Sequence, residues 1–280
     1  MFTTLISAGE LASHLEDPDW IVFDCRHDLA DPATGARAYA EAHIRGARHV
    51  NLDRDLSGSK NGRNGRHPLP EAKQFCARMA ALGLRCGMQV VAYDASGGPY
   101  AARLWWMLRW VGHAKVAVLD GGWNAWRKAG GAVDAVAPAI TPGNFVGAPL
   151  AITVDAALVE AAIGKPDLRL LDARSADRFR GENETLDPVG GHIPGALNRF
   201  FQLNLGTDGC FKPATVLKQE FAALLGTAKP AQVVHQCGSG VTACHNHLAM
   251  EIAGLAGSRI YPGSWSEWCS DPARPVATGP

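Results

Sequence analysis

The chain has 280 residues, 47% of them hydrophobic, which is enough for one large or two ordinary globular domains. Its 27 Lys and Arg residues balance 27 Asp and Glu residues, so the formal net charge is zero and gives no electrostatic argument for nucleic acid or a membrane surface as a partner. No stretch approaches the roughly 20 apolar residues of a membrane-spanning helix, so no such helix is expected.

The first half of the chain predicts alternating strands and helices. Its N-terminus has neither a basic start nor a long apolar run, so no signal peptide is indicated and a cytoplasmic location is expected. Short apolar runs rich in β-branched residues, typical of buried parallel strands, occur at residues 21–25, 90–94 and 116–120. The run at 90–94 is followed by Gly and Ser, and then by a helical pattern at 101–111.

The second half of the chain repeats this alternation after a linker. Residues 136–150 are rich in Pro, Gly and Ala and have no helical or strand periodicity, which predicts a linker. Strand-like runs follow at residues 168–172, 233–237 and 258–262, with a helical pattern at 242–254. Such alternation predicts an α/β fold with a parallel sheet, whose ligand site lies at the carboxyl ends of the strands.

The two halves are also similar in sequence. Four motifs recur in the same order at separations of 142 to 149 residues. They pair the following residues: Asp24 and Arg26 with Asp172 and Arg174, His43 with His192, Asp94 with Cys237, and Trp123 with Trp265. An ordered set of matches at nearly one spacing indicates a duplicated unit. We therefore expect two copies of one α/β domain, at residues 1–135 and 151–280, joined by the linker at 136–150.

Cys237 has the sequence surroundings of a reactive thiol. It ends a predicted strand, two glycines follow within three residues, and a predicted helix begins near Thr242. The backbone N–H groups of such a turn and of a helix N-terminus bind anions, which lowers the pKa of a thiol and favours the nucleophilic thiolate. The equivalent position in the first copy is Asp94, so only the second copy is expected to carry a nucleophile.

The other cysteines and histidines predict no metal site. The seven cysteines are scattered without CxxC pairs, which indicates neither a disulfide framework nor structural zinc. Cys244, His245 and His247 are close in sequence, but at helical spacing the two histidines point to different faces. His235 lies inside a predicted strand and is interpreted as a packed core residue.

Several motifs resemble the rhodanese family, specifically its sulfurtransferases with two tandem rhodanese-like domains. The resemblance covers nearly the whole chain. It rests on these motifs: DAR-x-x-x-RF from Asp172 to Phe179, GHIPGA from Gly191 to Ala196, CGSGVT from Cys237 to Thr242, and the paired GGW and GSW segments. The resemblance implies parallel sheets flanked by helices, a catalytically silent first copy, and catalysis by Cys237 in the second copy.

The loop that follows Cys237 resembles that of enzymes acting on 3-mercaptopyruvate. Thiosulfate enzymes of the family typically carry Arg and Lys in this loop, whereas the loop here has no charged residue. Ser239 is expected to take part in catalysis. The resemblance implies that the other loop residues bind substrate: Gly238, Gly240, Val241 and Thr242.

The resemblance also implies site residues outside the loop. Asp53 and His67 correspond to an Asp and a His that approach the loop, and with Ser239 they are expected to form a chain that moves a proton. Arg178 is expected to bind the carboxylate or sulfonate of the donor in a bidentate manner. Asp187 stands where mercaptopyruvate enzymes usually have a second substrate arginine. Three other arginines are alternatives for that role: Arg66, Arg180 and Arg199.

We therefore expect a sulfurtransferase that moves sulfur from a small anionic donor through a Cys237 persulfide to a thiol or cyanide. The favoured donor is 3-mercaptopyruvate, with thiosulfate as the alternative. No cofactor is expected; thioredoxin is a candidate acceptor, and the chain is expected to be a monomer. Two other readings are a sulfur-carrier module, which would turn over only with a protein partner, and a cysteine phosphatase. The phosphatase requires an arginine six residues after the cysteine, where this chain has Ala243.

Overall fold

The computed structural model describes residues 1–280, and its contacts divide the chain into two compact units. The first unit consists of Met1–Gly58, Leu69–Ala151 and Thr207–Cys210. The second unit consists of Ser59–Pro68, Ile152–Gly206 and Phe211–Pro280. Two short segments therefore depart from the predicted division of the chain, because residues 59–68 belong to the second unit and residues 207–210 to the first. Within the predicted linker, residues 137–150 form neither helix nor strand.

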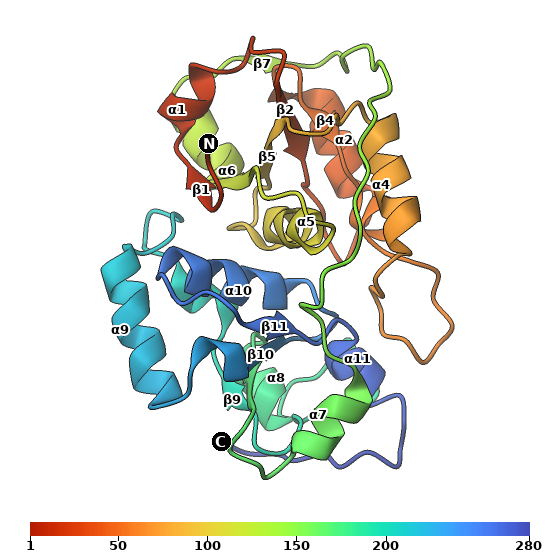
Figure 1. Ribbon diagram of the computed structural model, residues 1–280, viewed down its shortest axis with the longest axis vertical. Helices are drawn as coiled ribbons and strands as arrows, with labels where there is room; N and C mark the ends of the chain where they lie inside the picture. Colours follow the sequence, from red (N-terminus) through yellow and green to blue (C-terminus); the bar gives the residue numbers. More distant parts are fainter. The chain divides into compact units, whose positions relative to one another are not determined.

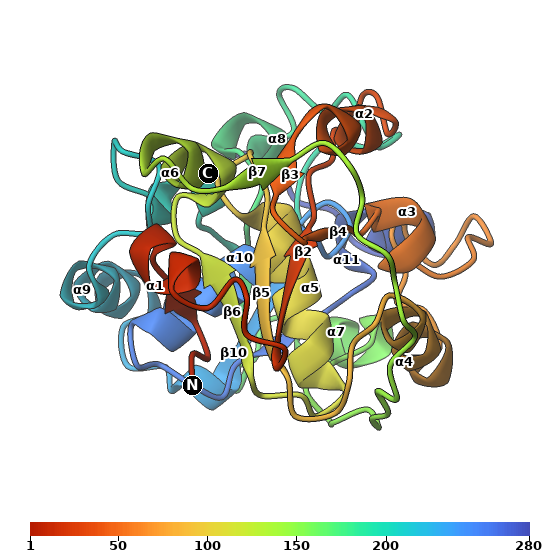
Figure 2. The same cartoon turned by 90° about the horizontal axis from the view of Figure 1, so that it is seen from above.

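The first unit is built around a parallel sheet of five strands in the order β1-β6-β5-β2-β4. Figure 2 shows β2, β5 and β6 side by side in this sheet. The sheet strands are β1 Leu5–Ile6, β2 Trp20–Asp24, β4 Arg48–His49, β5 Gln89–Tyr93 and β6 Val116–Leu119, and β3 His43–Ile44 pairs antiparallel with β7 Val133–Asp134. The helices are α1 Ala8–Ala12, α2 Thr34–Glu41, α3 Leu52–Asp55, α4 Ala72–Ala81, α5 Pro99–Trp110 and α6 Gly122–Lys128.

The central elements of the first unit follow from their apolar sequence. All five residues of β5 are buried, as expected for a parallel strand that has no polar face. Helix α5 has no polar stripe and is buried on nearly all sides, and Trp105 and Trp106 are fully buried in it. No helix of either unit combines the length and apolar character needed to cross a membrane.

The second unit is built around a parallel sheet of four strands in the order β11-β10-β8-β9. Figure 1 labels β9, β10 and β11 of this sheet. The strands are β8 Arg169–Asp172, β9 Leu197–Asn198, β10 Val233–Gln236 and β11 Arg259–Ile260. The helices are α7 Ala156–Ala162, α8 Ala176–Arg180, α9 Ala214–Leu225, α10 Thr242–Ile252 and α11 Ser264–Trp268, with 3-10 helices η1 Phe201–Asn204 and η2 Pro230–Gln232. The predicted α/β class, with parallel sheets flanked by helices, is confirmed.

The duplication is visible in a buried Asp–Arg ion pair that occurs once in each unit. Asp172 at the end of β8 accepts hydrogen bonds from Nε and Nη2 of Arg174, and this Nη2 also donates to the carbonyl of Gly191. The guanidinium lies 4.7 Å from the ring centre of Trp265. The same arrangement occurs in the first unit with these residues: Asp24, Arg26, Ala42 as the carbonyl acceptor, and Trp123 at 4.5 Å.

Candidate active site

Cys237 lies where β10 ends and the loop to α10 begins. The residue is almost fully buried, with 2% of its surface exposed. The N–H of Gly240 donates a hydrogen bond of 3.1 Å to Cys237 Sγ. The N–H of Cys237 itself donates to Ser264 Oγ at 3.1 Å. A backbone donor directed at the sulfur stabilises negative charge on it, so this loop can hold a thiolate or a persulfide anion.

Two backbone positions fix the shape of this loop. Gly240 has a φ of +78°, and a Cβ atom there would lie 2.4 Å from the carbonyl oxygen of Pro262, so only glycine fits. Ser264 has a φ of 55° and is the only non-glycine residue of the chain with a positive φ. Its equivalent in the first copy is Gly122, with a φ of 53°. The serine accepts this costly conformation where its hydroxyl holds the backbone of Cys237.

Sequence reasoning missed Ser264 as a site residue. The available signal was the change from GGW in the first half to GSW in the second, at a place where the two motifs otherwise align. Besides accepting from Cys237, the Ser264 hydroxyl donates to the carbonyl of Tyr261 at 2.9 Å. The N–H of Trp265 donates to the carbonyl of Cys237 at 2.9 Å. The start of α11 therefore positions Cys237 from both sides of its peptide unit.

The first unit shows how this kind of loop directs backbone donors at an acidic side chain. Asp94, at the position equivalent to Cys237, is fully buried after β5. Its carboxylate accepts four backbone hydrogen bonds of 2.8 to 3.0 Å, from these residues: Ser96, Gly98, Tyr100 and Ala101. Burial raises the pKa of the Asp94 carboxyl, because desolvation outweighs the four donors that lower it. The loop and the start of α5 thus form an anion-binding nest.

Replacing Asp94 with asparagine is expected to lower the free energy of unfolding by about 1–3 kcal/mol, because the single amide oxygen leaves buried N–H groups without an acceptor. The measurement is equilibrium unfolding in denaturant, with Glu41→Gln as an exposed control that also removes one carboxylate. Equal stability of the Asp94 variant and the control would contradict the importance of the nest.

His67 and Ser239 are in direct contact in the second unit. His67 Nδ1 lies 2.8 Å from Ser239 Oγ, and both residues are buried. The segment that carries His67 is held by the N–H of Arg66, which donates to Ser266 Oγ at 3.0 Å. Asp53 lies in α3 of the first unit, where its Oδ2 is 3.9 Å from Nε2 of His27. His67 and Ser239, two of the three residues expected to move a proton, are thus in contact. The role of Asp53 in proton transfer stays a prediction.

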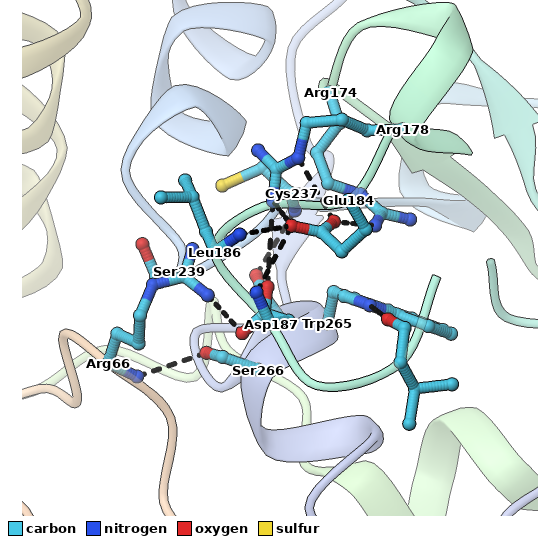
Figure 3. A network of polar contacts seen from close by, with 12 residues as sticks. Arg66, Arg174, Arg178, Glu184, Leu186, Asp187, Cys237, Ser239, Trp265 and Ser266 are labelled. Atoms are coloured by element: carbon cyan, nitrogen blue, oxygen red, sulfur yellow. Dashed lines mark hydrogen bonds and ion pairs between the residues drawn. The ribbon is translucent and has the colours of Figure 1, made fainter. Parts of the chain in front are cut away.

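Two arginine side chains lie against Gly238, the residue after Cys237. Figure 3 draws both arginines together with Cys237 and Asp187. A Cβ atom at Gly238 would be 2.8 Å from Nη2 of Arg66 and 3.4 Å from Nη2 of Arg178. Arg178 also forms a bidentate pair with Glu184, at 3.0 Å from Nε and 2.9 Å from Nη2. Arg66 forms an ion pair with Asp187, whose Oδ2 is 3.5 Å from Arg178 Nη2. An anion bound beside the loop therefore meets two guanidinium groups.

The other two arginines considered for the second position pair elsewhere. Arg180, at the end of α8, is partly exposed and forms a bidentate pair with Glu182 at 2.8 and 2.7 Å. Arg199 donates to Glu220 at 2.5 Å and to the side chain of Asn204. Among the three alternatives, only Arg66 lies against the loop.

Four of the other thiols lie outside the cysteine loop and are buried or partly buried. Burial raises the pKa of Cys25, Cys76 and Cys210, and it raises the pKa of Cys269 to about 11. These four thiols are therefore poor sources of thiolate at neutral pH.

The buried histidines of the second unit have structural partners. His235 is fully buried, and burial holds its pKa well below the ordinary range. Its Nε2 lies 3.0 Å from Ser258 Oγ, so the interpretation as a packed core residue is confirmed. His245 contacts Asn204, whereas His247 contacts Ser258, so the two side chains point to different neighbours as predicted.

Comparisons with known proteins agree on one family. The model of the Rhodanese-like domain matches the chain twice, at residues 7–129 and 155–271. A probable 3-mercaptopyruvate sulfurtransferase of Pseudomonas aeruginosa is 50% identical over 98% of both chains. A putative thiosulfate sulfurtransferase of Mycobacterium tuberculosis is 38% identical over 98% of this chain and 97% of its own length.

Solved structures give the same result. The 3-mercaptopyruvate sulfurtransferase of Leishmania major is similar with a TM-score of 0.84 and 31% identity, over 95% of this chain and 74% of its own. A structure of the Escherichia coli protein SseA, described as a 3-mercaptopyruvate sulfotransferase, is similar with a TM-score of 0.83 and 30% identity, over 94% of this chain and 99% of its own. Both similarities extend across the two units.

Proposed function

The chain belongs to the rhodanese family and is a sulfurtransferase, and from this we propose that Cys237 carries the transferred sulfur and that 3-mercaptopyruvate is the preferred donor. The observation that carries the proposal is the buried Sγ of Cys237, which accepts the N–H of Gly240. The loop without charged residues and the half-identical relative named for mercaptopyruvate support the choice of donor.

The proposed first step is attack by the Cys237 thiolate on the sulfur of the donor. An S–S bond forms, the C–S bond of 3-mercaptopyruvate breaks, and the electron pair of that bond leaves with the carbon as pyruvate enolate. A proton then moves to the enolate carbon and gives pyruvate. The Cys237 persulfide is held by the loop N–H groups until a thiol or cyanide attacks its outer sulfur. With thiosulfate, the leaving group is sulfite, which needs no proton at this step.

Ser239 and His67 are proposed to move the proton that the enolate requires. Their contact of 2.8 Å is short enough for proton transfer along a hydrogen bond, and both lie next to the cysteine loop. Asp53 is proposed as the third member of this proton-moving chain, as the family resemblance implies.

Replacing Ser239 with alanine is expected to lower kcat with 3-mercaptopyruvate by at least about tenfold, because it removes a positioned proton carrier. The rate with thiosulfate should change much less, since sulfite leaves without a proton. Ser239→Thr keeps the hydroxyl and is the matched control. The measurement is steady-state kinetics with both donors. An equal loss with both donors would mean that Ser239 only shapes the loop.

The proposal also covers the sulfur acceptor, the oligomeric state and the cellular location of the protein. A thiol acceptor fits a persulfide buried at 2% exposure, because it needs only a small or extended nucleophile to reach the outer sulfur. Thioredoxin is the proposed protein acceptor, and we propose that the chain acts as a monomer in a cytoplasmic setting, where its seven free thiols would stay reduced. Turnover with thioredoxin no faster than with a small thiol would argue against that acceptor.

Comparison of 3-mercaptopyruvate with thiosulfate as donors tests the proposed function as a whole. We expect a higher kcat/KM for 3-mercaptopyruvate, with pyruvate and a persulfide as products. A preference for thiosulfate of about tenfold or more, equal to 1.4 kcal/mol, would make thiosulfate the donor. Sulfur release from neither donor, with turnover only in the presence of a protein partner, would indicate a sulfur-carrier module.

A further inference from the structure

The cysteine loop borders a cluster of charged side chains within the second unit. We call it the charge cluster, and it consists of three arginines and three carboxylates: Arg66, Arg174, Arg178, Asp172, Glu184 and Asp187. Each carboxylate pairs with at least one of the arginines. Figure 3 draws Glu184 and Asp187 together with the three arginines. The formal charge of the cluster is therefore zero before any donor binds.

The ends of two guanidinium groups in the cluster remain directed at the loop. Glu184 occupies the Nε and Nη2 edge of Arg178, while Nη1 and Nη2 of Arg178 would be 3.7 and 3.4 Å from a Cβ atom at Gly238. Arg66 uses Nη1 for Asp187, and its Nη2 would be 2.8 Å from the same Cβ position. Both cations therefore face the place where a donor anion must lie beside Cys237.

Asp187 links these two cations and is itself desolvated. Its side chain is 3% exposed, and Oδ1 pairs with Arg66. Oδ2 is buried without a hydrogen bond, 3.5 Å from Nη2 of Arg178. A buried carboxylate at this place cancels one positive charge close to the loop, and its field is poorly screened by water.

We propose that Arg66 and Asp187 together determine which donor charge the site accepts. Arg66 supplies the second cation that binds the donor beside Arg178. Asp187 fixes the position of Arg66 and keeps the charge cluster neutral, so the site favours a donor with one negative charge over a donor with two. This inference rests on the proposed function, since it concerns the same donor site.

The physical basis is the repulsion between Asp187 and the donor. The 3-mercaptopyruvate ion carries one carboxylate charge, whereas thiosulfate carries two. A fixed negative charge opposes the dianion about twice as strongly as the monoanion at the same distance. Removing that charge should therefore help both donors and help thiosulfate more.

The test is the ratio of kcat/KM for thiosulfate to kcat/KM for 3-mercaptopyruvate in Asp187→Asn. We expect this ratio to rise about tenfold, because the cluster gains one net positive charge. Asp187→Glu keeps the charge and should keep the ratio of the unaltered protein. Glu182→Gln removes a carboxylate from the exposed pair with Arg180 and should also leave the ratio unchanged. The ratio is independent of the folded fraction of the sample, because both rates are measured on the same sample.

A second pair of variants tests the role of Arg66. Arg66→Gln should lower kcat/KM for both donors by about tenfold through KM, whereas Arg63→Gln, an exposed arginine of the same segment, should not. The inference would be overturned if the donor ratio stayed unchanged in Asp187→Asn, or if this ratio shifted equally in Asp187→Asn and Asp187→Glu. An unchanged KM in Arg66→Gln would also overturn it. If the unaltered protein transferred sulfur from neither donor, the proposed function itself would be overturned instead.

Discussion

Replacing Cys237 with serine is expected to lower sulfur release from either donor by at least about 10³-fold, because the variant loses the atom that forms the S–S bond. Serine is close to cysteine in size, and its hydroxyl oxygen can accept the N–H of Gly240 in place of the sulfur. The bond from the backbone N–H of residue 237 to Ser264 is unaffected, so the fold should persist. The variant should also fail to gain the mass of one sulfur atom after incubation with donor and no acceptor. Kinetics and intact-protein mass spectrometry measure the two effects.

The matched control for Cys237 is Cys86→Ser. Cys86 is an exposed free thiol of the first unit, and it would be the first to react if sulfur were transferred to surface thiols without catalysis. This control should keep full activity and still acquire one sulfur atom. The assignment of the nucleophile would be refuted if Cys237→Ser kept more than about one tenth of the activity. It would also be refuted if the persulfide were lost only in Cys86→Ser.

The duplicated α/β fold and the position of Cys237 could be predicted because both depend on local pattern. Residues 233–237 begin with two β-branched residues and are followed by glycines, which predicts a short strand whose last residue lies at the carboxyl edge of a parallel sheet. The repeat of the Asp-x-Arg pair also marks a shared structure, since Asp24 with Arg26 and Asp172 with Arg174 adopt the same buried geometry.

The partners of the loop could not be derived from local sequence patterns because they come from distant parts of the chain. Arg66 and Asp187 are 121 residues apart, and no periodicity relates them. The segment Ser59–Pro68 precedes the predicted linker yet folds with the second unit, which local sequence patterns do not encode. The positive φ of Ser264 could not be predicted from its residue type either, because glycine, not serine, usually adopts this conformation.

Replacing Arg178 with glutamine is expected to lower kcat/KM for 3-mercaptopyruvate by about 100-fold, mainly through KM, because a charge-assisted contact to the donor anion is lost. The same change removes the closest ion pair of Glu184, whose side chain is 4% exposed. The carboxylate keeps its 3.4 Å pair to Arg174 and the backbone N–H groups of Leu186 and Asp187. A partly unpaired buried carboxylate should lower the free energy of unfolding by about 1–3 kcal/mol. Donor binding and stability are therefore both affected, and they must be separated.

The double variant Arg178→Gln with Glu184→Gln separates the two effects. It removes the unpaired carboxylate together with the arginine, so part of the stability should return while KM stays high. Arg180→Gln is the matched control, because Arg180 lies two residues further along α8 and pairs with Glu182 at the surface. If the double variant regained a normal KM as well as stability, Arg178 would act only as the structural partner of Glu184. A KM that stays high in the double variant, beside an unchanged KM in the control, would identify Arg178 as a donor-binding residue.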